Sequence, residues 1–407
     1  MHILIVTQYF WPENFRINYL ALVLLEHGHQ VTVLTGVPNY PDGSFFEGYG
    51  YFNRQQEYHG IKVVRVPLIS RGKGGGVRLA LNYISFAVTA SIAGPLFCKG
   101  KYDLIFVFEP SPITVGIPAL ILKTLKSVPI LFWVQDLWPE SLSATGAVKS
   151  KTLLTLIERL VKFIYKRCDR ILIQSRSFFD SIVQQGGRSD RILYFPNSAE
   201  NIFNTSLPSS EYVPSLPEGF KIMFAGNIGA AQDFETILSA AEALKSYEDI
   251  KWIIIGEGRL SEWVHREVAT RKLHRTVYLL GRFPLEKMPL FFRMSDVMLV
   301  TLKRTPIFAL TIPSKIQSYL ACGRPIIAAL DGEGSKIVDD AGAGFTCPAE
   351  APTALAQAVI KMYEMPKHER EKMGMSGRRY YEANFDSDVL LDKLDLWMKE
   401  LVASSNS

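Results

Sequence analysis

Short apolar runs alternate with longer segments of helical periodicity along the whole chain. The runs are rich in β-branched residues, which is typical of strands buried on both faces of a parallel sheet. In the first half we expect strands at His2–Thr7, Gln30–Leu34, Leu104–Phe108, Ile130–Val134, Ile171–Ile173 and Ile192–Phe195. In the second half we expect them at Phe220–Ala225, Lys251–Ile255, Val277–Leu280, Val297–Thr301, Pro325–Ala329 and Gly344–Cys347. Helical segments lie between them, such as Phe15–Glu26, which Gly28 ends as a C-terminal cap would. This alternation predicts an α/β fold with a doubly wound parallel sheet in each half.

A polar stretch with three prolines separates the two series of strands. We therefore expect two Rossmann-like domains, 1–200 and 219–385, with a linker at 201–218. The last segment, 386–407, is expected to be a helix that crosses back to the first domain. Open α/β sheets bind ligands at the carboxyl ends of their strands. Two such sheets facing across a cleft would each supply half of a site.

Charge is distributed unevenly along the chain. The 45 Lys and Arg residues exceed the 40 Asp and Glu residues by five, and residues 58–135 carry nine basic but only two acidic residues. Such asymmetry indicates an anionic partner: a nucleic acid, a phosphorylated substrate or a membrane surface. No nucleic-acid-binding module accompanies it, so nucleic acid is not expected. The four cysteines form no CxxC pair and are interpreted as buried thiols, and no signal peptide is visible at Met1.

The segment Leu79–Phe97 has 19 residues without a charge, which is long enough to span a bilayer. One interpretation is a helix buried in the first domain, because a spanning segment would cut the sheet in two. The other is a helix that dips into the bilayer, since basic residues flank it on both sides. A second basic and apolar stretch, Lys149–Arg170, fits either interpretation.

Glycine turns follow two expected strands of the second half. Gly226, Asn227 and Gly229 follow one strand, and Gly256 and Gly258 follow the next. Small residues at such turns let backbone N–H groups approach a phosphate or edge a nucleobase. The alternative is an ordinary tight turn.

A third segment of the second half combines a helix start with a cation. Ser314 and Gln317 form a capping-box pattern, so a helix is expected to begin near Ser314. Lys315 then lies in the first turn, where a cation opposes the helix dipole unless an anion binds there. Lys315 is therefore a candidate diphosphate ligand, with a solvated lysine as the alternative. After the next strand, Glu333, with Gly334 and Ser335, could accept hydrogen bonds from a sugar hydroxyl or could simply begin a helix.

Carboxylates gather at the expected strand ends of the first half. Asp136 directly follows the strand Ile130–Val134 and could orient or deprotonate an acceptor hydroxyl, or cap the next helix. Glu13, Glu109 and Glu140 are expected to converge with it at one sheet edge, and Glu13 and Glu109 are further catalytic candidates beside Asp136. The seven histidines have no metal-ligand spacing, so no metal site is expected.

Several segments together resemble a known family. They are QYFWPE, GHQVTVLTGVPNYPDG, VQDLWPES, YFPNSAE, FAGNIG, IIIGEG, TIPSKIQSYLACGRPII and DGEGS. The chain resembles bacterial glycosyltransferases of the GT-B fold in retaining family 4, over nearly its whole length. Among these it is most similar to the branch named for N-acetyl-L-fucosamine transfer in O-antigen and capsule assembly.

The resemblance implies a UDP-sugar donor held by the second domain and a polyprenyl-diphosphate-linked sugar acceptor on the first, without a cofactor or metal. It implies a cytoplasmic enzyme at the inner face of the bacterial membrane. The acceptor is expected at Asn39, Tyr40, Trp138 and Glu140. Arg16 and Arg282 are expected to assist Lys315 at the diphosphate. Asn227, Gln232, Ser314 and Ser335 are also expected among the donor-binding residues.

The chain departs from the family pattern at its diphosphate clamp. The first-domain donor loop has no glycine at 14–17, and Gln135 replaces a histidine. Asn227 and Gln232 replace the usual Arg and Lys, and Leu310 and Ser318 replace a glutamate pair. Two alternatives therefore stay open beside transfer: a nucleotide-sugar 2-epimerase of the same fold, and an inactive transferase-like scaffold subunit.

Overall fold

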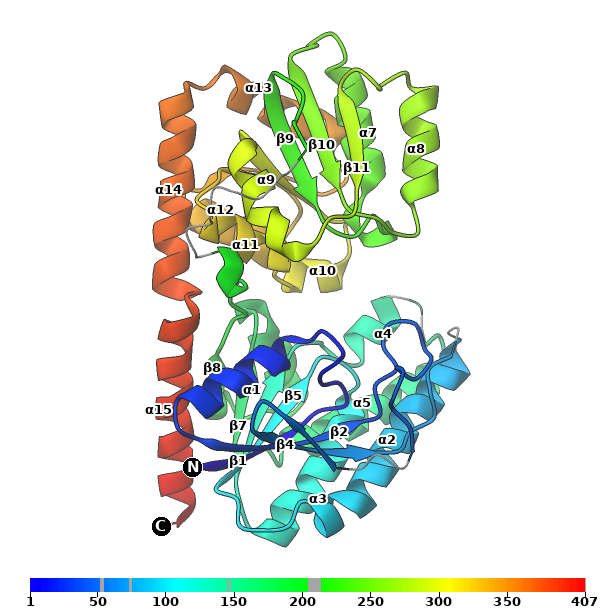
Figure 1. The fold of residues 1–407 in the computed structure, drawn as a ribbon, viewed down its shortest axis with the longest axis vertical. Helices are drawn as coiled ribbons and strands as arrows, with labels where there is room; N and C mark the ends of the chain where they lie inside the picture. The colour runs from blue at the N-terminus through cyan, green and yellow to red at the C-terminus, as the bar shows by residue number, and fades with distance from the viewer. Residues whose placement is uncertain (52–54, 73–74, 145, 147, 204–213, 407) are drawn as a thin grey trace. The chain divides into compact units, whose positions relative to one another are not determined.

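The chain folds into two compact units in a computed structural model that describes residues 1–51, 55–72, 75–144, 146, 148–203 and 214–406 (Figure 1). The first unit contains Met1–Phe195 and Lys393–Ser407, and the second contains Pro196–Asp392. Most of the expected linker, 204–213, lies outside the described residues. Just before it, Ala199 and Phe203 are buried in a core cluster of the second unit.

The first unit is built on an eight-stranded sheet of order β3-β4-β2-β1-β5-β6-β7-β8. The strands are β1 (His2–Val6), β2 (Gln30–Gly36), β3 (Gln55–Tyr58), β4 (Ile61–Val66), β5 (Leu104–Glu109), β6 (Ile130–Val134), β7 (Arg170–Ile173) and β8 (Ile192–Tyr194). All neighbours run parallel except β3, which pairs antiparallel with β4 at the edge. The central strands β1, β5 and β6 are buried almost throughout, as their uninterrupted apolar character predicts.

Helices cover the first sheet on both faces. They are α1 (Arg16–Glu26), α2 (Gly76–Phe97), α3 (Gly116–Lys126), α4 (Glu140–Ala144), α5 (Lys151–Tyr165) and α6 (Phe179–Gln184). Figure 1 shows α2, α3 and α5 together on one side of the sheet, and α2 contacts α3 as well as β2 and β4. The long helix α15 (Ser387–Asn406) begins in the second unit and belongs to the first from Lys393 on. Its Asp395 accepts from His29 at 2.9 Å.

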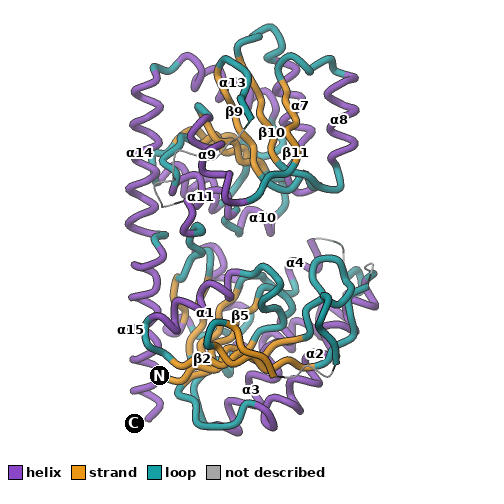
Figure 2. The backbone as a smooth tube through the Cα atoms, viewed as in Figure 1, coloured by secondary structure: helices purple, strands orange, loops and turns teal. Residues whose placement is uncertain are grey.

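The second unit is built on a six-stranded parallel sheet of order β11-β10-β9-β12-β13-β14. The strands are β9 (Phe220–Ala225), β10 (Ile250–Ile255), β11 (Val277–Gly281), β12 (Val297–Thr301), β13 (Ile326–Ala329) and β14 (Gly344–Cys347). The helices are α7 (Phe234–Ala243), α8 (Ser261–Thr270), α9 (Met288–Met294), α10 (Pro306–Leu310), α11 (Ser314–Ala321), α12 (Glu333–Asp340), α13 (Pro352–Glu364) and α14 (Lys367–Asn384). The tube in Figure 2 shows this alternation of strands and helices.

Alternate residues of the central strand β9 serve two separate cores. Ile222 and Phe224 pack into the cluster formed with α7, α8 and α13, whereas Met223 and Ala225 pack into the cluster formed with α9, α11 and α12. Successive side chains of a strand point to opposite faces of the sheet, so both faces must be covered by helices. The doubly wound parallel sheet expected in each half is therefore confirmed.

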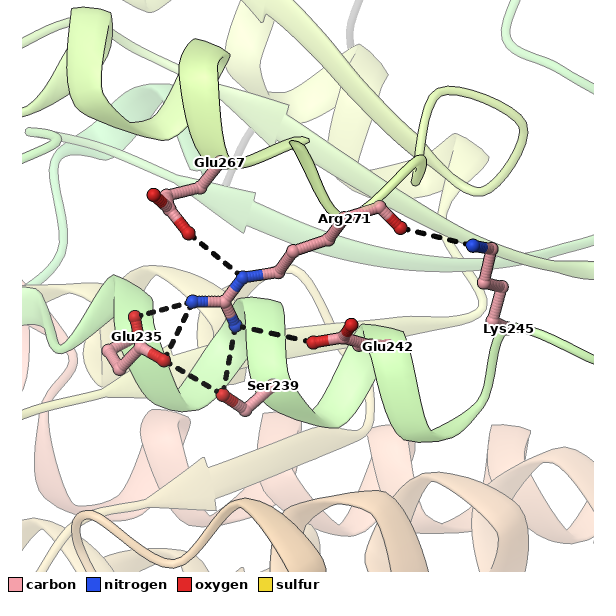
Figure 3. Close-up of polar contacts among 6 residues, drawn as sticks. All are labelled: Glu235, Ser239, Glu242, Lys245, Glu267 and Arg271. Atoms are coloured by element: carbon pink, nitrogen blue, oxygen red, sulfur yellow. Dashed lines mark hydrogen bonds and ion pairs between the residues drawn. The ribbon is translucent and has the colours of Figure 1, made fainter. Parts of the chain in front are cut away.

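One charged network joins α7 to α8 at the surface of the second unit. Arg271 donates to Glu267 at 3.0 Å and to both carboxylate oxygens of Glu235 at 2.8 Å (Figure 3). Its remaining nitrogen donates to Ser239 and lies 3.7 Å from Glu242. The glutamates are partly exposed, so this network fixes local geometry more than it stabilises the fold.

The structure corrects two expectations about secondary structure. Two strands are additional: β3 has the polar sequence QQEY, and Lys62 and Arg65 interrupt the apolar pattern of β4. The capping box at Ser314 is wrong: α11 does begin at Ser314, but Pro313 occupies the N-cap position and no side chain caps the helix. The Gln317 amide instead donates to the carbonyls of Pro313 and Ser314, each at 3.2 Å.

Candidate active site

Two glycine loops lie against each other at the carboxyl edge of the second sheet. The Gly226 N–H donates to the carbonyl of Ile255 at 2.8 Å, and the Ile228 N–H donates to the carbonyl of Glu257 at 3.0 Å. Gly256 has a φ of +135°, and a Cβ there would lie 1.9 Å from the Gly226 carbonyl oxygen. Any side chain at Gly256 would therefore push the two loops apart.

Asn227 fills the space between these loops. A Cβ at Gly229 would lie 2.6 Å from its side-chain nitrogen, and a Cβ at Gly258 would lie 2.5 Å from its side-chain oxygen. Glycine is thus required by close backbone packing at Gly256 and Gly258, and these loops expose backbone with few side chains. Such a surface can approach a phosphate or a base closely.

Lys315 reaches from the first turn of α11 to these loops. Its Nζ donates to Oε1 of Gln232 at 2.7 Å and lies 3.9 Å from the centre of the Phe224 ring. Gly226 makes room for it, since a Cβ there would meet Cε of Lys315 at 2.5 Å. Burial lowers the pKa of Lys315 to about 7.

No carboxylate pairs with the Lys315 ammonium among the described ion pairs. A buried cation that lacks an anionic partner is stabilised when an anion binds beside it. Gln232 is held in place in turn, because its backbone carbonyl accepts from the Thr301 hydroxyl. Gln232, expected among the donor-binding residues, therefore holds the Lys315 ammonium.

A second helix start packs beside that of α11. Gly334, in the first turn of α12, lies so close to Pro313 and Ile316 that a Cβ would meet each of them at 3.1 Å. Gly332 precedes the helix with a φ of +82°, where a Cβ would lie 2.0 Å from the Ala309 carbonyl oxygen. The N-termini of α11 and α12 therefore lie together, and both favour negative charge.

Four other expected donor residues differ in how they are placed. Glu333 is buried in the first turn of α12, while Ser314 is exposed. Arg282 is exposed directly after β11, where the Gly281 carbonyl accepts from the Gly256 N–H at 2.8 Å. Arg16 begins α1 in the other unit, so its contact with a diphosphate stays a prediction.

Asp136 lies at the carboxyl end of β6 in the first unit. Its Oδ2 accepts from Nε1 of Trp138 at 3.2 Å and from the Ser141 hydroxyl at 3.1 Å. Burial raises the pKa of Asp136 to about 6, against the opposing effect of these hydrogen bonds. A carboxylate with a pKa near the working pH is suited to orienting or deprotonating a hydroxyl.

Glu109 and Glu140 lie next to Asp136, as expected, but Glu109 cannot touch a substrate. It is fully buried, and neither of its carboxylate oxygens has a hydrogen-bond partner among the described residues. Burial and the neighbouring Asp136 raise its pKa well above the ordinary value. Glu109 is therefore corrected from a catalytic residue to a buried group behind Asp136. Glu140 accepts from the Ser181 hydroxyl at 2.6 Å.

Glu13 does not join this group, which is a correction. It is 1% exposed, and its carboxylate accepts from the backbone N–H groups of Asn39 and Tyr40, both at 2.8 Å. Burial raises the pKa of Glu13 to about 7, although these backbone bonds act in the opposite direction. The side chain therefore ties two loops together.

Asn39 is also corrected, from an acceptor ligand to a structural residue. It is 1% exposed, and its side chain accepts from the Arg71 N–H at 3.0 Å and donates to the Val37 carbonyl at 3.0 Å. A side chain engaged in this way cannot reach an acceptor. Tyr40, in contrast, is exposed, and the guanidinium of Arg71 lies 4.9 Å from the centre of its ring.

The structure adds three residues that sequence reasoning missed. Nη1 of Arg71 lies 3.4 Å from the hydroxyl of Tyr9, and the charge of Arg71 also acts on the Tyr83 hydroxyl. Tyr83 packs on Trp138, with ring centres 6.0 Å apart. Arg71 was counted among the basic residues, but nothing in the sequence places it beside Tyr9 and Tyr40.

Among the described residues, no three His, Cys, Asp or Glu side chains are arranged to hold a metal ion. The four cysteines are free, and only Cys322 is partly exposed.

Both halves of the chain match known families. Residues 14–198 match the glycosyl transferase 4-like domain, and residues 213–380 match glycosyl transferases group 1. Over 303 residues the chain is 29% identical to WbjE of Pseudomonas aeruginosa, named a probable glycosyltransferase, covering 71% of this chain and 74% of that protein. Over 384 residues it is 24% identical to WcaI of Escherichia coli K12, named for colanic acid biosynthesis, covering 90% and 91%.

Solved structures share the whole architecture. Anabaena HepE in complex with UDP superposes with a TM-score of 0.70 at 14% identity, covering 98% of this chain and 100% of that one. Sucrose-phosphate synthase of Thermosynechococcus elongatus gives a TM-score of 0.70 at 15% identity, covering 99% of each chain. The two parallel-sheet units and these similarities define a protein of the GT-B fold. The protein is a glycosyltransferase, with a 4-like domain in its first half and a group 1 domain in its second.

Proposed function

We propose that the enzyme moves an N-acetylamino sugar from a UDP-sugar to a polyprenyl-diphosphate-linked sugar during O-antigen or capsule assembly. N-acetyl-L-fucosamine is the first candidate for the sugar. The observation that carries the donor part is Lys315, a half-buried ammonium held by Gln232 beside two closely packed glycine loops. HepE, which shares the fold, was solved with UDP, and WcaI is named for a polysaccharide pathway.

Lys315 and the starts of α11 and α12 would bind the donor diphosphate. Charge develops on the diphosphate oxygen as its bond to the anomeric carbon breaks, and preorganised cations and helix N-termini stabilise that charge. The acceptor hydroxyl would attack the same face of the sugar and pass its proton to the leaving phosphate oxygen. Asp136 would orient that hydroxyl. No metal ion is needed for any of these steps.

The surface of the first unit supports a membrane-bound acceptor. Helix α2 is, by length and composition, the one helix among the described residues that could cross a membrane. It does not lie free, since Asn82, Phe86 and Ala90 are buried against the unit. Its opposite side exposes a stripe of large apolar side chains, namely Val77, Leu81, Ile84, Val88, Ile92 and Leu96. This stripe, with basic residues around it, is suited to lie in the interface of an anionic membrane. We therefore propose peripheral attachment to the inner face of the cell membrane.

The test is transfer from a panel of UDP-sugars, including UDP-N-acetyl-L-fucosamine, to a polyprenyl-diphosphate-linked N-acetylamino sugar, with and without EDTA. We expect transfer from one donor at a rate that EDTA does not change. An EDTA-sensitive rate would assign the diphosphate charge to a metal ion. Epimerised free nucleotide sugar as the product would instead favour the 2-epimerase alternative. UDP binding by folded protein without turnover of any donor would favour the scaffold alternative.

A further inference from the structure

A groove runs between helices α2 and α5 on the first unit. Its volume is about 550 Å³, within the range of sites that enclose most of a small molecule. Its walls are aliphatic and aromatic, apart from Thr114 and one charged residue, Arg159. The helices supply Leu79, Ile84, Leu153, Leu156, Leu160 and Phe163, among others.

This groove differs from the outer stripe of α2. Ile84 belongs to both, but Val77, Val88, Ile92 and Leu96 face away from the groove walls. Ile84, Val88 and Ile92 of the stripe line a smaller hollow of about 270 Å³, while Val77, Leu81 and Leu96 are exposed outside it. The groove is concave, and α2 and α5 form its two sides. This shape fits a single hydrocarbon chain better than it fits the surface of a bilayer.

One wall of the groove leads to polar groups. Trp138 and Tyr83 both line it. Trp138 donates to the Asp136 carboxylate at 3.2 Å. The Tyr83 hydroxyl interacts with the hydroxyl of Tyr9, and Nη1 of Arg71 lies 3.4 Å from that Tyr9 hydroxyl. An apolar channel therefore adjoins a cation and a carboxylate. The matching ligand has an apolar chain, an anionic head that Arg71 can attract, and a hydroxyl that Asp136 can accept from.

We propose that this groove binds the first isoprene units of the lipid-linked acceptor and so fixes its diphosphate and sugar beside Arg71 and Asp136. The inference rests on the proposed function and deepens it, because the enzyme itself would bind the polyprenyl chain of the acceptor. The membrane alone would not hold that chain. The enzyme then distinguishes acceptors by their chain as well as by their sugar.

The test compares two acceptors that carry the same diphosphate-linked sugar, one on an undecaprenyl chain and one on a methyl group. Leu156→Gln places an amide in the groove at a position 61% exposed, so folding is expected to survive. Its matched control is Leu125→Gln on α3, also 61% exposed and outside the groove. Loss of a well-packed hydrophobic contact costs about tenfold or more in kcat/KM.

We expect Leu156→Gln to lower kcat/KM about tenfold for the undecaprenyl acceptor and to leave the methyl acceptor unchanged. Leu125→Gln should change neither. Equal losses of kcat/KM in both variants would assign the effect to bilayer contact and overturn the proposal. The proposal would also be overturned if Leu156→Gln left the ratio of kcat/KM for the two acceptors unchanged.

A binding measurement separates failure of the groove from failure of the proposed function. Farnesyl phosphate with a photoreactive group at its terminal isoprene should crosslink to peptides of α2 or α5 in the wild type, and less in Leu156→Gln. This readout needs no turnover. Crosslinking without transfer to either acceptor would support the groove and contradict the proposed reaction, whereas crosslinking elsewhere would overturn the groove.

Discussion

The two units offer their ligands different kinds of surface. The second unit uses backbone: Gly226, Gly256 and Gly258 bring loops together without side chains, and one lysine enters the space they leave. The first unit uses side chains: Asp136, Trp138, Tyr83 and Arg71 form its polar site. The diphosphate is the same in every UDP-sugar, so the proposed donor site can bind it with backbone, helix ends and the one cation Lys315. An acceptor varies between enzymes, and only side chains can distinguish one from another.

Their outer surfaces differ as well. Among the described residues, the second unit exposes three large apolar side chains, Tyr247, Leu285 and Met375. The first unit exposes eighteen, concentrated on α2 and α5 and including Ile92 and Leu156. Contiguous exposed apolar surface marks an interaction site. This difference supports the proposal that the first unit binds the membrane and the acceptor, whereas the second acts on a water-soluble donor.

The largest effect is expected at the single cation of the donor loops. Lys315→Ala should lower kcat about 10²–10³-fold, the usual result of removing one group that stabilises developing charge. Lys336→Ala, at an exposed position of α12, is the matched control and should retain the wild-type rate. Wild-type turnover in Lys315→Ala would show that another group carries the diphosphate charge.

The next effect concerns the carboxylate of the acceptor side. Asp136→Asn should lower kcat about 10²-fold. Because burial raises the pKa of Asp136 to about 6, the carboxylate is ionised above that pH and protonated below it. The wild-type rate should therefore fall as the pH drops through 6, and Asp136→Asn should lose this acidic limb. An unchanged limb in the variant would assign it to another group.

A smaller effect tests the apolar surface of the first unit. Ile92→Glu should weaken binding to vesicles of phosphatidylglycerol and phosphatidylethanolamine about tenfold. It removes an apolar contact between Ile92 and the bilayer, and anionic phosphatidylglycerol repels the new carboxylate. Met375→Glu changes an exposed side chain of the second unit and serves as the control. Equal vesicle binding by wild type and Ile92→Glu would remove α2 from the membrane surface.

The smallest effect is expected at the Arg271 network. Arg271→Ala should lower the free energy of unfolding by about 1 kcal/mol or less, because the glutamates around it are solvent-accessible. Urea unfolding of the wild type and Arg271→Ala in low and high salt measures this difference in the free energy of unfolding. The difference should shrink at high salt, because salt screens the charges. A loss of several kcal/mol would mean that the network stabilises the fold more than exposed ion pairs do.

Sequence reasoning worked best where one local property decides the outcome. The buried strands β6, β9 and β12 lie where their apolar runs predict, since a strand covered on both faces needs no alternation. It failed where packing between segments far apart in the sequence determines the position of a side chain. Glu13 and Asn39 have the right chemistry for a site, but loops folding over them turn both inward.

The position of Lys315 was predicted from the sequence, but its contacts were not. Its place in the first turn of α11 follows from the sequence, whereas the contacts with Phe224 and Gln232 come from a strand and a loop more than 80 residues earlier. Arg71 beside Tyr83 has the same origin in tertiary packing. Motif spacing can propose such residues, and only the fold can bring their partners together.

The most direct test of the donor site is proton uptake on UDP binding. With a pKa of about 7, Lys315 is mostly neutral at pH 8 in the free protein, and a bound diphosphate should raise its pKa and protonate it. Calorimetric titrations of wild type and Lys315→Ala with UDP at pH 8, in buffers of different ionisation enthalpy, measure this uptake. The account predicts that the wild type takes up close to one proton more per UDP than Lys315→Ala. Equal proton uptake by the two proteins would contradict the role of Lys315 as the diphosphate ligand.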